Sequence, residues 1–198
     1  MLKFVKICNY MNKKFDEFFY RLNNFSPEIK QKDRLELIAN ELNKKIKETN
    51  VLVFLCTHNS RRSQICEVWG SIFSLIYKKE ILINSAGTIK TSVHKEIFNV
   101  LKKCGVSVNE NEEIAFKNLL IKLKSKTLDQ IDAKKFIAIM TCSDAEKSCP
   151  IDSRSVKNIN MFFKDPKVYD NTKYMEEEYL KTNSNIAEEL NYIFKRIN

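Results

Sequence analysis

One cysteine of this chain stands where a buried strand should end. Residues 51–55, VLVFL, form a continuous apolar run that leads directly into Cys56. Such a run is typical of a strand buried on both faces of a parallel sheet. Ligands of open α/β sheets bind at the carboxyl ends of the strands. A thiol at that point is therefore placed to act as a nucleophile.

The residues after Cys56 suit the binding of a tetrahedral anion. The turn THNSRRS leads into a helix expected to begin near Ser63, and the backbone N–H groups of such a turn favour an oxyanion and a thiolate alike. Arg62 supplies a planar guanidinium that can bind two anion oxygens. Ser63 can donate its hydroxyl to the thiolate, and Asn59 tolerates the left-handed backbone conformation. We expect the anion to lie among Thr57, His58, Asn59, Ser60, Arg61 and Arg62.

The cysteine count favours redox or metal chemistry over structural disulfides, because the chain resembles a cytoplasmic protein of ordinary size. The six cysteines are Cys8, Cys56, Cys66, Cys104, Cys142 and Cys149. No two of them form a Cys-x-x-Cys pair, and there are only two histidines, so we expect no metal site of the zinc type. Cys8, Cys66 and Cys104 read as ordinary buried or half-buried thiols.

The elements that must position Cys56 alternate between strand and helix. Further strands are expected in EILINSAG, KFIAIMTC and NINMFF, and helices follow the first two strands and close the chain. This alternation predicts βαβ units, so the fold class is α/β, with an open, mostly parallel four-stranded sheet and helices on both faces. The segment from about 107 to 132 is polar and irregular, which predicts a loop or a short helix.

Residues 1–49 read as a helical N-terminal extension packed on an α/β domain of residues 50–198. Ser26 and Pro27 suit the start of a helix, as N-cap and first helical residue. Beyond them Leu35, Ile38, Leu42 and Ile46 recur at helical spacing and form one apolar stripe. We expect this part of the chain to cover the core rather than to carry chemistry.

The composition argues against nucleic acid and membrane as partners. The net charge is +9, but only six of the 34 basic residues are arginine and the lysines are scattered along the chain. A basic surface still raises the local concentration of phosphate-like anions. No apolar run approaches the length of a membrane span, and no secretory signal is evident, so we expect a cytoplasmic protein.

The motifs together resemble the low-molecular-weight protein tyrosine phosphatase superfamily and its thioredoxin-coupled arsenate reductases. CTHNSRRS resembles the anion-binding loop, NSAG at 84–87 the second-strand motif, and Asp165-Pro166 the general-acid loop, over about residues 51–196. The resemblance implies that Asp165 is the general acid. The family pattern has glycine at His58 and a second cysteine at Arg61, so the disulfide that protects the loop in some phosphatases is absent.

The resemblance leaves two enzymes and one binding module open. TCSDAEKSCP resembles the redox segment of the arsenate reductases and implies that Cys142 attacks Cys56, after which Cys149 pairs with Cys142. A phosphatase would need only Cys56, Arg62 and Asp165, and a non-catalytic oxyanion-binding module only the loop. The family's two aromatic residues after Asp-Pro are replaced by Lys167 and Val168, which favours a small inorganic oxyanion.

The same resemblance extends to an ion and to partners. Asn59, Glu67 and Ser85 resemble positions that bind potassium in some reductases. A reductase of this kind has no tightly bound cofactor and draws electrons from an external thioredoxin. We expect arsenate or a phosphate-type oxyanion as substrate and a monomeric protein.

Overall fold

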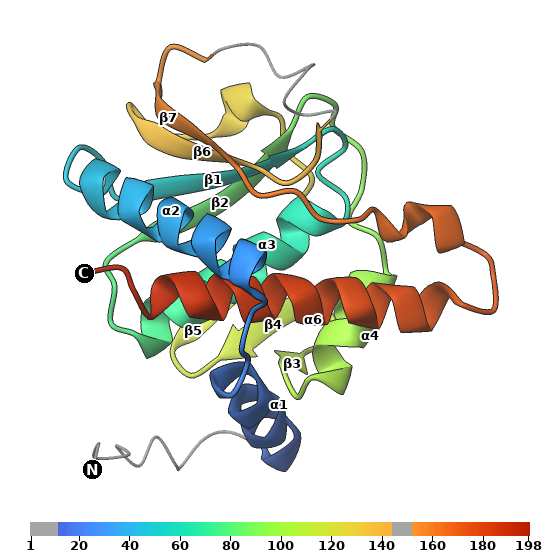
Figure 1. The fold of residues 1–198 in the computed structure, drawn as a ribbon. Coiled ribbons are helices and arrows are strands. Elements are labelled where there is room, and N and C mark those ends of the chain that lie inside the picture. The colour runs from blue at the N-terminus through green and yellow to red at the C-terminus, as the bar shows by residue number, and fades with distance from the viewer. Residues whose placement is uncertain (1–11, 144–151) are drawn as a thin grey trace.

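A four-stranded parallel sheet forms the centre of the computed structural model, which describes residues 12–143 and 152–198 (Figure 1). The strands are β1 (Val51–Cys56), β2 (Leu82–Gly87), β6 (Phe136–Met140) and β7 (Ser155–Asn160). Their order is β2-β1-β6-β7 and all three pairings are parallel. The predicted four-stranded α/β fold is confirmed, with β1 and its terminal Cys56 in the interior of the sheet.

The two faces of β1 enter two different clusters of buried residues. Leu52 and Phe54 belong to the larger core, which joins the sheet to α3 (Arg62–Ile76) and α6 (Met175–Phe194). Val53 and Leu55 belong to a smaller cluster on the opposite face. Because side chains alternate along a strand, burial on both faces explains why the sequence of β1 is apolar without a break. The terminal helix α6 is unbroken.

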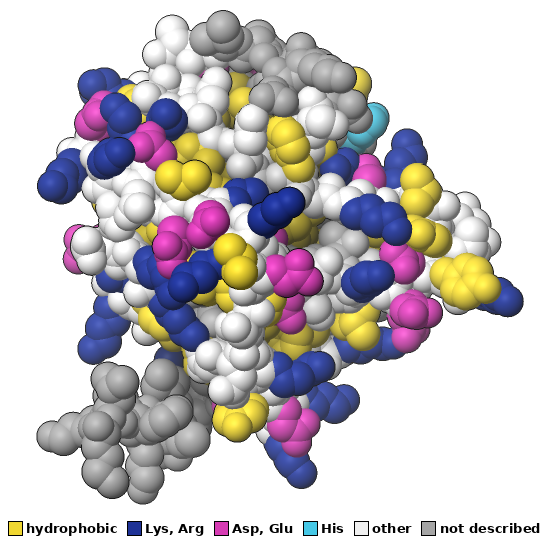
Figure 2. All heavy atoms as spheres, viewed as in Figure 1, with side chains coloured by type: hydrophobic (Ala, Val, Ile, Leu, Met, Phe, Trp, Pro, Cys, Tyr) yellow, Lys and Arg dark blue, Asp and Glu magenta, His cyan; other side chains and the backbone are white. Residues whose placement is uncertain are grey.

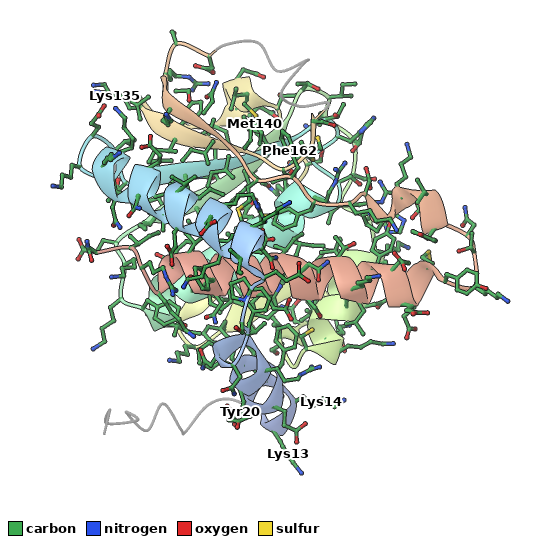
Figure 3. All side chains as sticks on the ribbon, in the orientation of Figure 1. Lys13, Lys14, Tyr20, Lys135, Met140 and Phe162 are labelled. Carbon is green, nitrogen blue, oxygen red and sulfur yellow. The ribbon has the colours of Figure 1, made fainter. Side chains whose placement is uncertain are left out.

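The N-terminal helices α1 (Lys13–Asn23) and α2 (Ile29–Lys45) share the larger core. Figure 1 shows α2 and α6 running side by side beneath the sheet, and the two helices are in contact. Lys13, Lys14 and Tyr20 point away from the core on the outer side of α1 (Figure 3). The division of the chain into two units at residue 49 stays a prediction.

The start of α2 differs from the prediction, and a glycine follows the end of α4. Helix α2 begins at Ile29 with Glu28 as its N-cap, so the predicted start at Ser26 and Pro27 was two residues early. Helix α4 (Glu96–Lys103) ends before Gly105, whose φ is +79°. A Cβ at Gly105 would lie 2.2 Å from the backbone nitrogen of Phe15, so this glycine also permits the close approach of α1.

Residues 107–122 form a small antiparallel sheet, so the prediction of a loop or short helix was wrong there. The strands are β3 (Ser107–Val108), β4 (Glu113–Phe116) and β5 (Leu119–Lys122), in the order β3-β4-β5. Ile114, Phe116 and Ile121 are buried at alternating positions. A 3₁₀ turn, η1 (Leu128–Gln130), follows, and its Leu128 packs against the smaller cluster.

Charged side chains of both signs are interspersed over the face drawn in Figure 2, and no basic stripe crosses that face. This distribution agrees with the scattering of lysines along the sequence. Within the described residues, no helix is long and apolar enough to cross a membrane.

Candidate active site

The Cys56 sulfur lies at the base of the turn that joins β1 to α3. Its Sγ is 3.0 Å from the Ser63 Oγ and accepts the Asn59 backbone N–H at 3.2 Å. Cys56 is 5% exposed, so these two donors replace much of the water that would otherwise solvate a thiolate. The left-handed conformation of the turn falls on Asn59, with φ +45°, and His58 does not adopt it.

A row of buried polar side chains lies directly behind this turn and consists of Asn59, Ser63, Gln64, Glu67 and Ser85. The Asn59 side-chain amide donates to Ser63 Oγ at 2.9 Å and to Ser85 Oγ at 2.8 Å, and the Ser85 hydroxyl donates to Glu67. The Asn59 Oδ1 accepts from Gln64 at 2.9 Å and from the backbone N–H of Lys126 at 2.7 Å. These bonds fix the amide of Asn59 in one orientation, and the whole row is buried at the carboxyl ends of β1 and β2.

Gly87, at the end of β2, allows the turn to approach this strand closely. A Cβ at Gly87 would lie 2.8 Å from both the Asn59 nitrogen and the Thr57 oxygen, closer than side-chain carbons come to backbone atoms. The backbone of Thr57 is in turn held by the Ile89 N–H at 2.9 Å. The glycine of the NSAG sequence therefore sets the position of the turn that follows Cys56.

The structure brings Arg62 and Asp165 together at the mouth of the turn. Their side chains form an ion pair with an N···O distance of 2.5 Å, and Arg62 also donates to the Phe163 carbonyl at 3.0 Å. Asp165 accepts the Lys167 N–H at 3.0 Å and so caps the 3₁₀ turn η2 (Pro166–Tyr169). Both residues line one small pocket with Cys56, as the prediction of an anion-binding arginine and a general acid requires.

Among the residues that the structure describes, the lining of this pocket includes no aryl side chain that could grip a phenyl ring. Val168 is 71% exposed, and the Tyr169 hydroxyl is engaged by Lys164 at 2.8 Å. Lys167 instead adds a third cation beside the two arginines. The lining residues are Cys56, Thr57, His58, Ser60, Arg61, Arg62, Asp165 and Lys167.

A second cysteine lies next to the Cys56 turn. Strands β1 and β6 are neighbours, and the backbone N–H of Thr141 bonds to the Leu55 carbonyl at 2.8 Å. Two residues beyond β6, the Cys142 Sγ is 3.9 Å from the Thr57 Oγ1, and Cys142 belongs to the same buried cluster as Cys56. Cys149, the third predicted redox residue, lies outside the described residues.

Arg61 lines the pocket, and its guanidinium ties the turn to α6 and the segment after η2. It donates to the Tyr179 hydroxyl at 2.5 Å and pairs with Asp170, which also accepts from Tyr179 at 2.6 Å. His94 stacks on Tyr179 with ring centroids 5.1 Å apart, and its Nε2 is 3.8 Å from Asp170. The pKa of His94 is lowered by burial and by the charge of Arg61. We refer to Arg61, Asp170, Tyr179 and His94 as the Arg61 cluster.

The three residues predicted to hold potassium come together, but their oxygen atoms are already occupied by donors. Ser85 donates to one Glu67 oxygen, and the Lys126 ammonium lies 3.4 Å from the other. A potassium ion needs several oxygen atoms whose lone pairs face it, whereas Asn59 presents its NH₂ group to Ser85. The arrangement therefore does not fit a potassium ion. Nor do the described residues contain a group of three metal-ligating side chains.

The remaining described cysteines have inert surroundings. Burial raises the pKa of Cys66, with a smaller contribution from the neighbouring Cys56, and burial raises the pKa of Cys104 to about 12. Both cysteines belong to the larger core, and the Cys104 sulfur accepts a hydrogen bond from the Asn183 side chain at 3.2 Å. Their surroundings agree with the prediction of ordinary buried thiols.

Sequence reasoning missed Lys126, Asp170 and Tyr179, although each contacts the turn or its supports. All three are remote from Cys56 along the chain: Lys126 lies between β5 and η1, Asp170 directly follows η2, and Tyr179 lies in α6. Only Asp170 carried a signal, because it follows the predicted acid loop by five residues.

The chain is similar in sequence to curated arsenate reductases. Arsenate reductase 2 of Staphylococcus epidermidis is 31% identical over 119 residues, which cover 60% of this chain and 80% of the relative. Arsenate reductase 2 of Staphylococcus haemolyticus is 30% identical over 120 residues, with the same shares. No family model matches the chain.

Two solved structures share the fold at low identity. An arsenate reductase in the oxidized state aligns with a TM-score of 0.54 and 16% identity over 76% of this chain and 100% of that chain. A mutant of YwlE from Bacillus subtilis aligns with a TM-score of 0.51 and 14% identity over 73% and 96%.

Proposed function

The chain belongs to the arsenate reductase family, and we propose that it reduces arsenate with electrons from its own thiols. In this proposal Cys56 is the nucleophile, Asp165 the general acid, and Cys142 and Cys149 the redox pair. The backbone amides of Thr57, His58, Asn59, Ser60 and Arg61, with the Arg62 guanidinium, bind the oxyanion. Ser63 supports the thiolate.

The observation that carries the proposal is the position of Cys142. Hydrolysis of a phosphate ester needs one cysteine, whereas reduction of arsenate needs a second thiol that can reach the first. Cys142 lies beside Thr57 in the same buried cluster as Cys56. The described residues that line the pocket include no aryl side chain, which supports a small inorganic substrate in addition.

The first step forms a bond between the Cys56 sulfur and arsenic. Arg62 and the turn amides balance the charge of the oxyanion, and Arg62 releases Asp165 as it turns to the substrate. Asp165, in its protonated form, gives its proton to a hydroxyl of arsenate, which leaves as water as the arsenic–oxygen bond breaks.

The second step transfers the electrons. The Cys142 thiolate attacks the Cys56 sulfur, a disulfide forms, and the sulfur–arsenic bond breaks with its electron pair staying on arsenic. Arsenic is thereby reduced from As(V) to As(III) and departs as arsenite. The Cys149 thiolate then attacks Cys142, which moves the disulfide to Cys142 and Cys149 and restores Cys56. This exchange requires the segment between them to bring their Cα atoms within about 7 Å.

An external dithiol must then reduce the second disulfide. We propose a thioredoxin-type protein as this donor, acting on a monomeric enzyme in the cytoplasm, where such reductants keep thiols reduced. The proposal needs no bound cofactor.

Turnover assays on three proteins test this function. Wild type, Cys149→Ser and Cys142→Ser are each assayed for arsenate-dependent oxidation of thioredoxin and for hydrolysis of an aryl phosphate. We expect both substitutions to abolish multiple turnovers with arsenate, because neither variant can pass the disulfide outward. Equal arsenate turnover in wild type and Cys149→Ser would contradict the proposal.

A phosphatase is the second candidate, because Cys56, Ser63, Arg62 and Asp165 suffice to form and hydrolyse a phosphocysteine. In the same assays it predicts aryl phosphate hydrolysis that both cysteine substitutions leave intact, with no arsenate turnover in wild type. Tight phosphate binding without either activity would indicate an oxyanion-binding module instead.

A further inference from the structure

Lys126 holds the row of polar side chains behind the Cys56 turn at two points. Its backbone N–H donates to the Asn59 Oδ1 at 2.7 Å, and its ammonium lies 3.4 Å from the Glu67 Oε1. Its backbone carbonyl accepts the Gly87 N–H at 2.8 Å, which fixes this residue beside the end of β2. The lysine thus contacts both the residue that shapes the turn and the one carboxylate of the row.

The hydrogen bonds of the row run in one direction. Glu67 is an acceptor only while ionised, so Ser85 must donate to it and accept from the Asn59 amide. The other proton of that amide goes to Ser63, which leaves the Ser63 hydroxyl free to donate to the Cys56 sulfur. An ionised Glu67 therefore orients every donor so that a thiolate is favoured at the far end.

Keeping Glu67 ionised requires a cation, because the residue is only 7% exposed. Burial raises the pKa of Glu67, and the Lys126 charge together with the Ser85 hydrogen bond opposes that rise. Within the described residues, Lys126 is the basic side chain paired with this carboxylate. A buried carboxylate that loses its only charge partner is strongly destabilised.

We propose that Lys126 is a positioning residue that supplies the counter-charge of the oxyanion turn from within the chain, so that the reactivity of Cys56 does not depend on a bound monovalent cation. The ammonium stands against the carboxylate oxygen that a potassium ion would need. This inference concerns the same site as the proposed function, but it depends only on Cys56 reacting as a thiolate. Alkylation of Cys56 tests it without turnover.

The experiment measures the rate at which iodoacetamide modifies Cys56, read by mass spectrometry of the Cys56 peptide, across pH. Each protein is studied in potassium chloride and in tetramethylammonium chloride at equal ionic strength. The variants are Lys126→Met, Lys126→Gln and Lys126→Arg. Lys124→Met is the matched control, because Lys124 lies two residues away and its side chain is exposed.

We expect wild type and Lys124→Met to react equally in the two salts. At neutral pH, Lys126→Met and Lys126→Gln should react about tenfold more slowly, as expected when a hydrogen bond to a charged group is lost. Lys126→Arg should recover most of the rate. If arginine but not glutamine restores the alkylation rate, the effect of Lys126 comes from its charge and not from a merely structural contact. The unfolding temperature of each variant reports any structural effect independently.

Two results would overturn the proposal. One is a saturable increase of the wild-type rate with potassium, which needs no variant and stays decisive if a substitution prevents folding. The other is a Lys126→Met rate equal to wild type in both salts. A protein that fails to reduce arsenate yet shows the expected alkylation pattern would refute the proposed function and leave the role of Lys126 standing.

Discussion

Replacement of Arg61 by methionine should destabilise the protein because it opens the Arg61 cluster. The substitution keeps most of the apolar stem but removes the guanidinium that joins Tyr179 to Asp170. The side chains of Arg61 and Asp170 are only 14% and 20% exposed, so the pair is closer to a buried ion pair than to a surface one.

The loss of stability in Arg61→Met depends on the partners that Asp170 retains. Loss of one partner from a fully buried pair costs roughly 3–5 kcal/mol. Asp170 retains the Tyr179 hydroxyl at 2.6 Å and some contact with water, which reduces the cost to about 2–3 kcal/mol by the usual value of charged hydrogen bonds. For a chain of this length that corresponds to a decrease in Tm of roughly 4–12 °C.

Urea and thermal unfolding of wild type, Arg61→Met, Asp170→Asn and the double variant measure this effect. We expect the double variant to lose about 1–2 kcal/mol less than the sum of the single losses, since the two residues contact each other. A decrease below about 0.5 kcal/mol in Arg61→Met would refute the reasoning, because that is the value of a solvated surface pair.

Three further predictions concern the same region. The pKa of His94 is lowered in the folded state, so the unfolded chain binds the His94 proton more readily. The free energy of unfolding should therefore rise as pH increases to about 6.5. His94→Gln should flatten that rise in urea titrations between pH 5 and 7.5. Gly87→Ala should weaken phosphate binding by at least tenfold in calorimetry, since its Cβ would displace the turn; unchanged affinity would show that the turn can shift. Cys66 and Cys104 should resist alkylation at pH 7.5 in the folded protein while Cys56 reacts, because burial raises the pKa of both; peptide mapping before and after denaturation checks this.

The parts of the fold that the sequence predicts are those with a strong local pattern. Strand β1 is apolar throughout because both of its faces are buried, and Cys56 marks its end. The small sheet of residues 107–122 was missed because its strands have two to four residues and alternate too briefly to be distinguished from a polar loop. Helix α2 begins two residues later than predicted, with Glu28 as an N-cap whose side chain makes no capping hydrogen bond, because residue types alone do not fix a helix end to the residue.

The site residues that could be predicted are likewise those whose positions depend on local sequence. Cys56, Ser63 and Arg62 are close in sequence, so spacing alone brings them to one turn. Asp165 and Cys142 required a resemblance to a known family. Lys126 and Tyr179 are single residues far from Cys56 along the chain, and nothing in their neighbours indicates that they will contact Glu67 and Arg61. Their contacts depend on the tertiary arrangement.

The directional hydrogen bonds behind the turn also bear on how the thiol relay proceeds. In a disulfide between Cys56 and Cys142, an incoming thiolate expels one of the two sulfurs, and the better stabilised thiolate departs faster. The Ser63 hydroxyl and the backbone N–H of Asn59 already contact the Cys56 sulfur and can stabilise negative charge on it. The donors that make Cys56 a nucleophile thus also make it the preferred leaving group. In the proposed relay, attack on Cys142 would therefore be favoured over attack on Cys56, and the turn itself would give the relay its outward direction.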